Sequence, residues 1–186
     1  FGAPMAVLRE LLARSRTNPP VVEFRDPLTH ELREEALTAD AISGVARLYA
    51  YVPQLAAMLP MTLAEAAAGH PETLLAQRHM IESLVGVQIM HGMELAVLCS
   101  EDADLLAVNP ADASTLMGTS FVEALLAQCA VWPRGARPGE FHDPVRSDAP
   151  VLLLSGEFDP VTPPRYGEQV LRTLPNARHL VARGQG

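Results

Sequence analysis

The sequence contains no lysine, few aromatic residues and no long apolar run. All 14 basic residues are arginines, 22 acidic residues outnumber them, and the formal net charge is −8. An acidic chain without a basic cluster lacks the electrostatic footprint that binding to a phosphate backbone requires, so nucleic acid is excluded as a partner. No apolar segment approaches the roughly 18 to 20 residues needed to cross a bilayer, so no membrane span is expected.

Cysteine is also scarce. Cys99 and Cys129 are the only two, and they form neither a Cys-x-x-Cys pair nor a zinc-binding spacing. On the residues alone, two interpretations stay open. The cysteines are either two buried thiols or one disulfide, and a disulfide would indicate an exported protein because reducing compartments keep thiols free.

The composition is that of a folded chain. Hydrophobic residues make up 48% and charged residues 19% of 186 residues, which is enough for one domain or one and a half. Apolar residues at helical spacing predict that residues 1–148 are mostly helical, with a short hairpin at 21–37. Residues 149–186 predict a β-loop-α-β unit.

Prolines divide the helical region. Pro53 and Pro60 bracket a short predicted helix, and Thr62 caps a separate one over 63–68. A longer helix is predicted to begin at Pro71 because proline is favoured at the first helical position. The proline-rich stretch 133–150 is typical of a loop or linker.

The pattern changes after this linker. Val151–Leu154 is a continuous apolar run without alternation, which is typical of a parallel strand buried on both faces. A loop at 156–160, a helix from Pro164 to Leu174 and a second strand at 177–183 are predicted to follow.

Asp159 is the candidate functional residue of this unit. It lies just past the carboxyl end of the first strand, where open α/β sheets place functional groups. Pro160, Pro163 and Pro164 stiffen the loop, and a rigidly held carboxylate suits a residue that orients an imidazole. The alternative is that Asp159 only caps a turn, and the residues by themselves do not separate the two interpretations.

The residues around Asp159 carry a resemblance. Residues 156–163 read Gly-Glu-Phe-Asp-Pro-Val-Thr-Pro, 174–181 read Leu-Pro-Asn-Ala-Arg-His-Leu-Val, and 184–186 read Gly-Gln-Gly. Together they resemble the acid-residue motif of α/β-hydrolases, in the tripeptidyl aminopeptidase-like branch related to the proline iminopeptidases. A weaker likeness extends over the helical part, at 48–49, 59–60, 67–69, 96–102 and 129–133.

The resemblance implies a fold and a function. Residues 1–148 would be the helical cap of an α/β-hydrolase fragment, and 149–186 the C-terminal part of its core, truncated before the expected catalytic histidine. The parent protein would be a serine hydrolase that releases residues or short peptides from peptide N-termini by acyl transfer, with no metal or organic cofactor. Its partners would be a peptide substrate and the missing N-terminal part of the core. The alternatives are an ester-cleaving hydrolase of the same fold and a non-catalytic helical binding module.

By this resemblance Asp159 is the triad acid, and the histidine would follow Gly186. His179 does not fit that role because it lies inside the predicted last strand. The nucleophile should sit on a Gly-x-Ser-x-Gly elbow upstream of the acid. None of the eight serines has glycine at both −2 and +2, and Ser120 comes nearest, with Gly118 before it but Val122 after it. The chain is therefore expected to be inactive alone.

The resemblance also bears on Glu101 and the cysteines. Related enzymes hold the free α-amino group of the substrate with acidic residues from or near the cap, which makes Glu101 a candidate. The alternative is a solvated acidic loop. The resemblance includes both cysteine positions, so a Cys99–Cys129 disulfide is expected. It would place the protein outside the cell or in the cell envelope, with the bacterial cytoplasm as the alternative.

Two helical His-x-x-Glu pairs have the spacing of metal ligands. They are His79 with Glu82 and His91 with Glu94. Di-metal bundles use the reverse order, Glu-x-x-His, so no metal site is expected.

Overall fold

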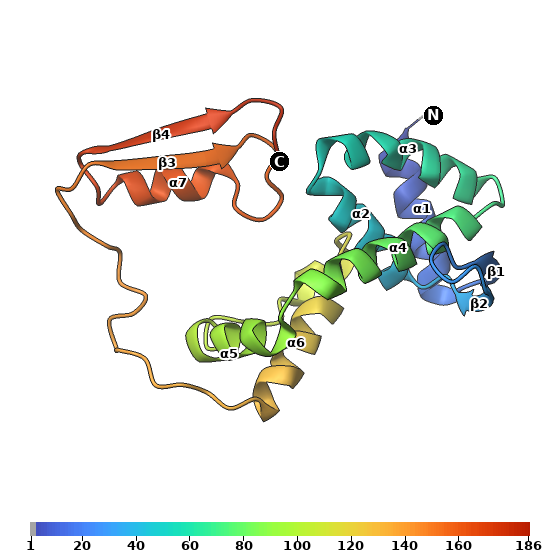
Figure 1. The fold of residues 1–186 in the computed structure, drawn as a ribbon, viewed down its shortest axis with the longest axis horizontal. Coiled ribbons are helices and arrows are strands. Elements are labelled where there is room, and N and C mark those ends of the chain that lie inside the picture. The colour runs from blue at the N-terminus through green and yellow to red at the C-terminus, as the bar shows by residue number, and fades with distance from the viewer. Residues whose placement is uncertain (1–2) are drawn as a thin grey trace. The chain divides into compact units, whose positions relative to one another are not determined.

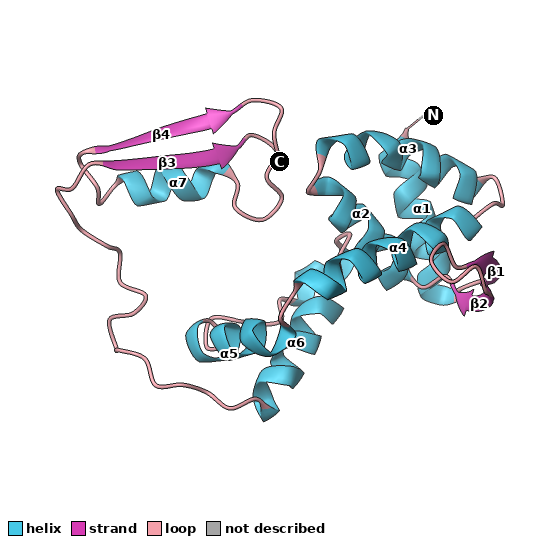
Figure 2. Cartoon of the chain, viewed as in Figure 1, coloured by secondary structure: helices cyan, strands magenta, loops and turns pink. Residues whose placement is uncertain are grey.

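The computed structural model describes residues 3–186, apart from the side chains of 85–88. The elements run in the order shown in Figures 1 and 2. They are α1 (Pro4–Thr17), β1 (Val21–Arg25), β2 (Leu32–Ala36), α2 (Ala39–Ala50), α3 (Pro53–Ala67), α4 (Glu72–Gln88), α5 (His91–Glu101), the 3-10 helix η1 (Pro110–Ser114), α6 (Ser120–Val131), β3 (Val151–Gly156), α7 (Pro164–Leu171) and β4 (Ala177–Ala182). The described chain is thus mostly helical, with a parallel two-stranded sheet near the C-terminus, as expected for a partial α/β-hydrolase.

The chain forms two compact units. The first runs to Val45 and continues from Pro60 to Phe141, and the second contains Ala46–Leu59 and His142–Gly186. Leu8, Ile42, Val45, Leu74 and Leu75 are among the most deeply buried side chains of the first unit. Each lies on the apolar stripe of α1, α2 or α4, and burial of those stripes drives the packing of the helices.

A hairpin packs on the first unit's helices. β1 and β2 are antiparallel, with Val21 opposite Ala36 and Arg25 opposite Leu32. Val22 and Phe24 are buried while the other side chains of β1 are exposed, so the strand alternates as a half-buried strand should. β1 contacts α4, which places the hairpin against that helix.

One helix differs from the sequence-based expectation. α3 is continuous from Pro53 to Ala67 and carries Pro60 in its interior, so Pro60 does not separate two helices. Proline removes one backbone hydrogen bond and disfavours a helix interior. Thr62, Leu63 and Ala66 are nevertheless all buried, and packing of this face outweighs the local preference.

The C-terminal unit holds the parallel sheet. β3 and β4 pair from Val151 opposite Ala177 to Gly156 opposite Ala182, and α7 covers one face of the pair (Figure 1). The expectation that β3 is buried on both faces is wrong. Leu152 is 59% and Leu154 73% exposed, because no element of the described chain covers the face that they share.

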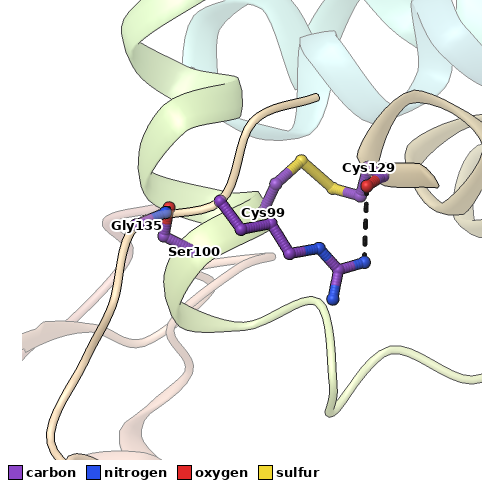
Figure 3. Close-up of a disulfide and its surroundings, with 5 residues drawn as sticks. Cys99, Ser100, Cys129 and Gly135 are labelled. Atoms are coloured by element: carbon purple, nitrogen blue, oxygen red, sulfur yellow. Dashed lines mark hydrogen bonds between the residues drawn. A yellow bond between two sulfur atoms is a disulfide. The ribbon is translucent and has the colours of Figure 1, made fainter. Parts of the chain in front are cut away.

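A disulfide joins α5 to α6. The structure bonds Cys99 to Cys129, with their Cα atoms 5.1 Å apart (Figure 3). Both cysteines are almost fully buried and cluster with Ala103, while Leu95, Leu98 and Trp132 pack against them.

The segment that follows α6 is fastened to the end of α5. The Gly135 N–H donates to Ser100 Oγ at 2.8 Å, and Arg137 forms an ion pair with Asp104. Beyond this point, residues 142–150 form no helix or strand, in agreement with the predicted linker.

Candidate active site

Asp159 lies in the loop directly after β3, and its carboxylate organises that loop. Oδ1 accepts hydrogen bonds from the backbone N–H groups of Val161 and Thr162, both at 2.8 Å. Oδ2 accepts a third from the hydroxyl of Thr162, also at 2.8 Å. Pro160 presets the backbone between them, so the orientation of the carboxylate is fixed by its own loop.

These donors favour the ionised carboxylate. The backbone N–H of Thr162 lowers the pKa of Asp159 most, followed by that of Val161 and the Thr162 hydroxyl, while desolvation opposes them. Asp159 is therefore an anion at neutral pH. Oδ2 has accepted one donor and, like any carboxylate oxygen, can accept a second, so the half-buried group retains capacity for a partner such as an imidazole N–H.

Asp159 borders an open, mostly apolar hollow of about 560 Å³. Its walls come from the ends of both strands and from the loop after β4, and Asp159 is the only ionisable side chain among the lining residues, which are Leu154, Ser155, Gly156, Asp159, Leu180, Val181, Ala182, Gln185 and Gly186. A single anion at the edge of an apolar surface, at the carboxyl end of parallel strands, is the usual position of a functional carboxylate in an α/β sheet.

The loops after β3 and β4 are bonded to each other beside this carboxylate. The N–H of Glu157 donates to Ala182 O at 3.0 Å, and that of Phe158 donates to Gln185 O at 2.8 Å. The side chain of Glu157 adds a third link, since its Oε2 accepts from the Gly184 N–H at 2.9 Å. The backbone that leads to Gly186 is thus held next to the backbone that leads to Asp159.

His179 and Ser155 form a hydrogen-bonded pair, but on the sheet face that α7 covers. His179 Nε2 lies 2.9 Å from Ser155 Oγ. The ring also lies against Gly167 of α7, where an added Cβ would stand 2.6 Å from Nε2. His179 lies within β4, where the sequence placed it, and its packing under α7 accounts for the glycine in that helix.

Glu101 lies in the other unit, at the last position of α5 and two residues after Cys99. Its side chain is partly exposed. The structure therefore places Glu101 beside the disulfide-linked helix pair and leaves its role as an amine-binding residue a proposal.

Only one of the two His-x-x-Glu pairs forms a contact between its own histidine and glutamate. His91 Nδ1 lies 3.2 Å from Glu94 Oε2 on the exposed side of α5. His79 does not use Glu82, which pairs with Arg78 instead. No group of three or more His, Cys, Asp or Glu in the described part of the chain is arranged to hold a metal ion.

His79 instead joins a network that sequence reasoning missed. Its Nε2 lies 2.7 Å from Glu35 Oε1 on β2, and its Nδ1 lies 3.5 Å from Asp26 Oδ2 in the hairpin turn. Asp26 also accepts from the N–H groups of Leu28 and Thr29 and pairs with Arg33. The N–H of Thr29 and then that of Leu28 lower the pKa of Asp26 most, so the turn contains a buried anion that ties the hairpin to α4.

Residues 114–186 match the family model described as TAP-like protein, an α/β-hydrolase family. This C-terminal part of the chain is therefore similar to TAP-like α/β-hydrolases. The matched range contains α6, the linker and the whole β3–α7–β4 unit, and therefore Asp159 and Cys129. No curated protein and no solved structure matches the chain.

Two residues that bond within the loops around Asp159 were not identified from the sequence. Thr162 had a readable signal, since an aspartate three residues before a threonine is a pattern of side-chain-to-backbone turns. Glu157 had none, because its contact with Gly184 joins positions 27 residues apart and depends on the register of β3 with β4.

Proposed function

We propose that the 186 residues are the cap and the last β-α-β unit of a serine hydrolase that removes residues or short peptides from peptide N-termini. The observation that carries the proposal is Asp159, an oriented anion with acceptor capacity left, at the carboxyl end of a parallel strand in a segment that matches TAP-like α/β-hydrolases. The serine and the histidine would come from sequence outside these residues.

The proposed chemistry is acyl transfer. The serine oxygen attacks the scissile carbonyl carbon while the histidine accepts the hydroxyl proton, and the histidine then gives this proton to the leaving amine. A water molecule then attacks the acyl-enzyme in the same way, with the histidine as base, and the acyl group is released as the carboxylic acid while the serine is restored. Asp159 fixes the imidazole tautomer and stabilises the imidazolium, which its low pKa permits because the carboxylate stays ionised throughout.

The exposed sheet face supports the proposal that a further part of the core packs here. Leu152, Leu154 and Leu180 are each more than half exposed on one face of a parallel pair. Parallel sheets occur almost only with both faces covered, so these side chains indicate a missing layer. The N-terminal part of the hydrolase core is the proposed partner.

The disulfide supports the proposal that the protein is exported. A bridged, buried Cys99–Cys129 pair is compatible with an oxidising compartment such as the cell envelope or the exterior. No helix of the described residues is long and apolar enough to span a membrane.

Specificity for a free N-terminus is the finer part of the proposal, and Glu101 is its candidate residue. The test uses protein that contains the serine and histidine, with matched peptides that carry a free or an acetylated N-terminus and a simple ester as third substrate. Glu101→Gln should raise KM for the free peptide about 10- to 100-fold, the equivalent of one charged hydrogen bond, and leave ester cleavage unchanged.

Asp102→Asn is the matched control, because it removes the same charge one residue further on, at an exposed position. Equal cleavage of free and acetylated peptides by the wild type would refute the aminopeptidase assignment and favour the ester-cleaving alternative. Equal effects of Glu101→Gln and Asp102→Asn would instead show that Glu101 is only part of a solvated acidic surface at the end of α5.

A further inference from the structure

The loop after β4 uses a backbone conformation that favours glycine. Gly184 has φ +68, in the left-handed region that other residues avoid. At Gly156, on the neighbouring strand, an added Cβ would stand 2.8 Å from Gln185 O. The two loops therefore approach each other closely at Gly156, where a side chain would collide with the backbone of Gln185.

Backbone bonds fix two points of this approach, and a side chain fixes the third. Ala182 and Gln185 accept from the backbone of the β3 loop, on either side of the Gly184 turn. The Gly184 N–H lies between these two points and points to the carboxylate of Glu157. Glu157 is itself exposed, so it contributes little burial, and its visible contact is this bond to the turn.

We propose that Glu157 is a positioning residue for the catalytic histidine. The inference rests on the proposed function, in which that histidine follows Gly186. By holding the Gly184 turn against the Asp159 loop, Glu157 sets where the chain leaves Gly186 and so the distance between the imidazole and the Asp159 carboxylate. It touches neither substrate nor imidazole and acts through the backbone.

The requirement is for an acceptor atom and not for a charge. Glu157→Gln keeps an oxygen that can accept from the Gly184 N–H, whereas Glu157→Ala removes it. A residue that acted through its charge would be damaged by both changes. A residue with no positioning role would tolerate both, because the two backbone bonds would hold the loop alone.

The first experiment measures loop order in the 186-residue chain and does not depend on activity. Amide hydrogen exchange at Gly184 is compared in wild type, Glu157→Gln, Glu157→Ala and Glu168→Ala, the last a control on exposed α7 surface. Glu157→Ala should exchange Gly184 at least about tenfold faster, and the other two should stay near wild type. Unchanged exchange in Glu157→Ala would overturn the positioning role.

The second experiment measures turnover in protein that carries the serine and histidine. Glu157→Ala should lower kcat about 10- to 100-fold at nearly constant KM, since a misplacement of about 1 Å has effects of that size, and Glu157→Gln should restore most of it. Full kcat in Glu157→Ala would refute the inference and leave the proposed function standing. If the wild type shows no hydrolase activity, the proposed function is refuted. The catalytic role of Glu157 is then refuted as well, even if the exchange experiment shows that Glu157 orders the Gly184 turn.

Discussion

Removal of the Cys99–Cys129 disulfide should destabilise the α5–α6 part of the first unit by several kcal/mol. The bridge closes a loop with a sequence separation of 30 residues. In the chain-entropy model a loop of about 30 residues loses about 12 cal/mol/K of unfolded-state entropy, or about 3.6 kcal/mol at 25 °C. Few other contacts join the two helices, so little would compensate for the loss.

The chain carries its own fluorescent probe for this unfolding. Trp132 is the only tryptophan, and it packs against the disulfide cluster, so its emission follows the unfolding of this region. In urea, with a slope of about 1–3 kcal/mol/M, the Cys99→Ala/Cys129→Ala variant should unfold at a midpoint about 1–4 M lower than oxidised wild type. Dithiothreitol should lower the wild-type midpoint and leave that of the variant unchanged.

Two results would refute this reasoning. One is a urea midpoint in the double variant within about 0.3 M of wild type, because the bridge would then not lower the entropy of the unfolded chain measurably. The other is the recovery of two alkylatable thiols from protein produced under oxidising conditions, which would show that the bridge does not form.

The remaining predictions concern activity, acid stability and one packing contact. The isolated 186-residue chain should turn over neither aminoacyl nor p-nitrophenyl ester substrates and should not be labelled by a fluorophosphonate, and activity that co-purifies with the chain and disappears in Asp159→Ala would contradict this. The pKa values of Asp26 and Asp159 lie below the ordinary 3.8, so the stability that the two carboxylates contribute is present above about pH 4 and is lost as the pH falls through the lowered values. Asp26→Asn should therefore reduce the loss of folded structure that circular dichroism records as the pH falls below about 4. An unchanged acid unfolding curve in this variant would contradict the prediction. Gly167→Ala should lower Tm although alanine favours helices, because its Cβ meets the ring of His179, and in a His179→Ala background the same change should raise the stability by about 0.5–1 kcal/mol; equal effects in both backgrounds would exclude the contact.

Local patterns predicted the part of the site that is local. The apolar run of β3, the glycine after it and the prolines around Asp159 indicated a strand, a sharp turn and a stiff loop, and the structure contains all three. The same run was misread as buried on both faces. A continuous apolar run indicates that both faces of a strand pack against other elements, but it does not show whether those elements lie within the same segment of chain.

Non-local contacts account for most of what the sequence did not predict. Pro60 ends a helix by local rules, yet α3 continues through it because its buried face packs. The sequence analysis considered His79 with Glu82, which lies three residues further along the same helix, whereas its partners Asp26 and Glu35 lie on the hairpin. The cysteines could be paired only through the resemblance, since spacing alone left free thiols equally open.

The central claim is that Asp159 is the triad acid, and kcat of Asp159→Asn tests it most directly. In protein that carries the serine and histidine, asparagine can still accept from the N–H groups of Val161 and Thr162, so Tm should stay close to wild type. It cannot stabilise an imidazolium, and kcat should fall about 10⁴-fold, as it does when the acid of a Ser-His-Asp triad is neutralised. Glu168→Gln, which removes one carboxylate from the same unit, should keep full activity. A kcat for Asp159→Asn within about tenfold of wild type, or a loss that only follows a large drop in Tm, would contradict the claim and reduce Asp159 to the anchor of its turn.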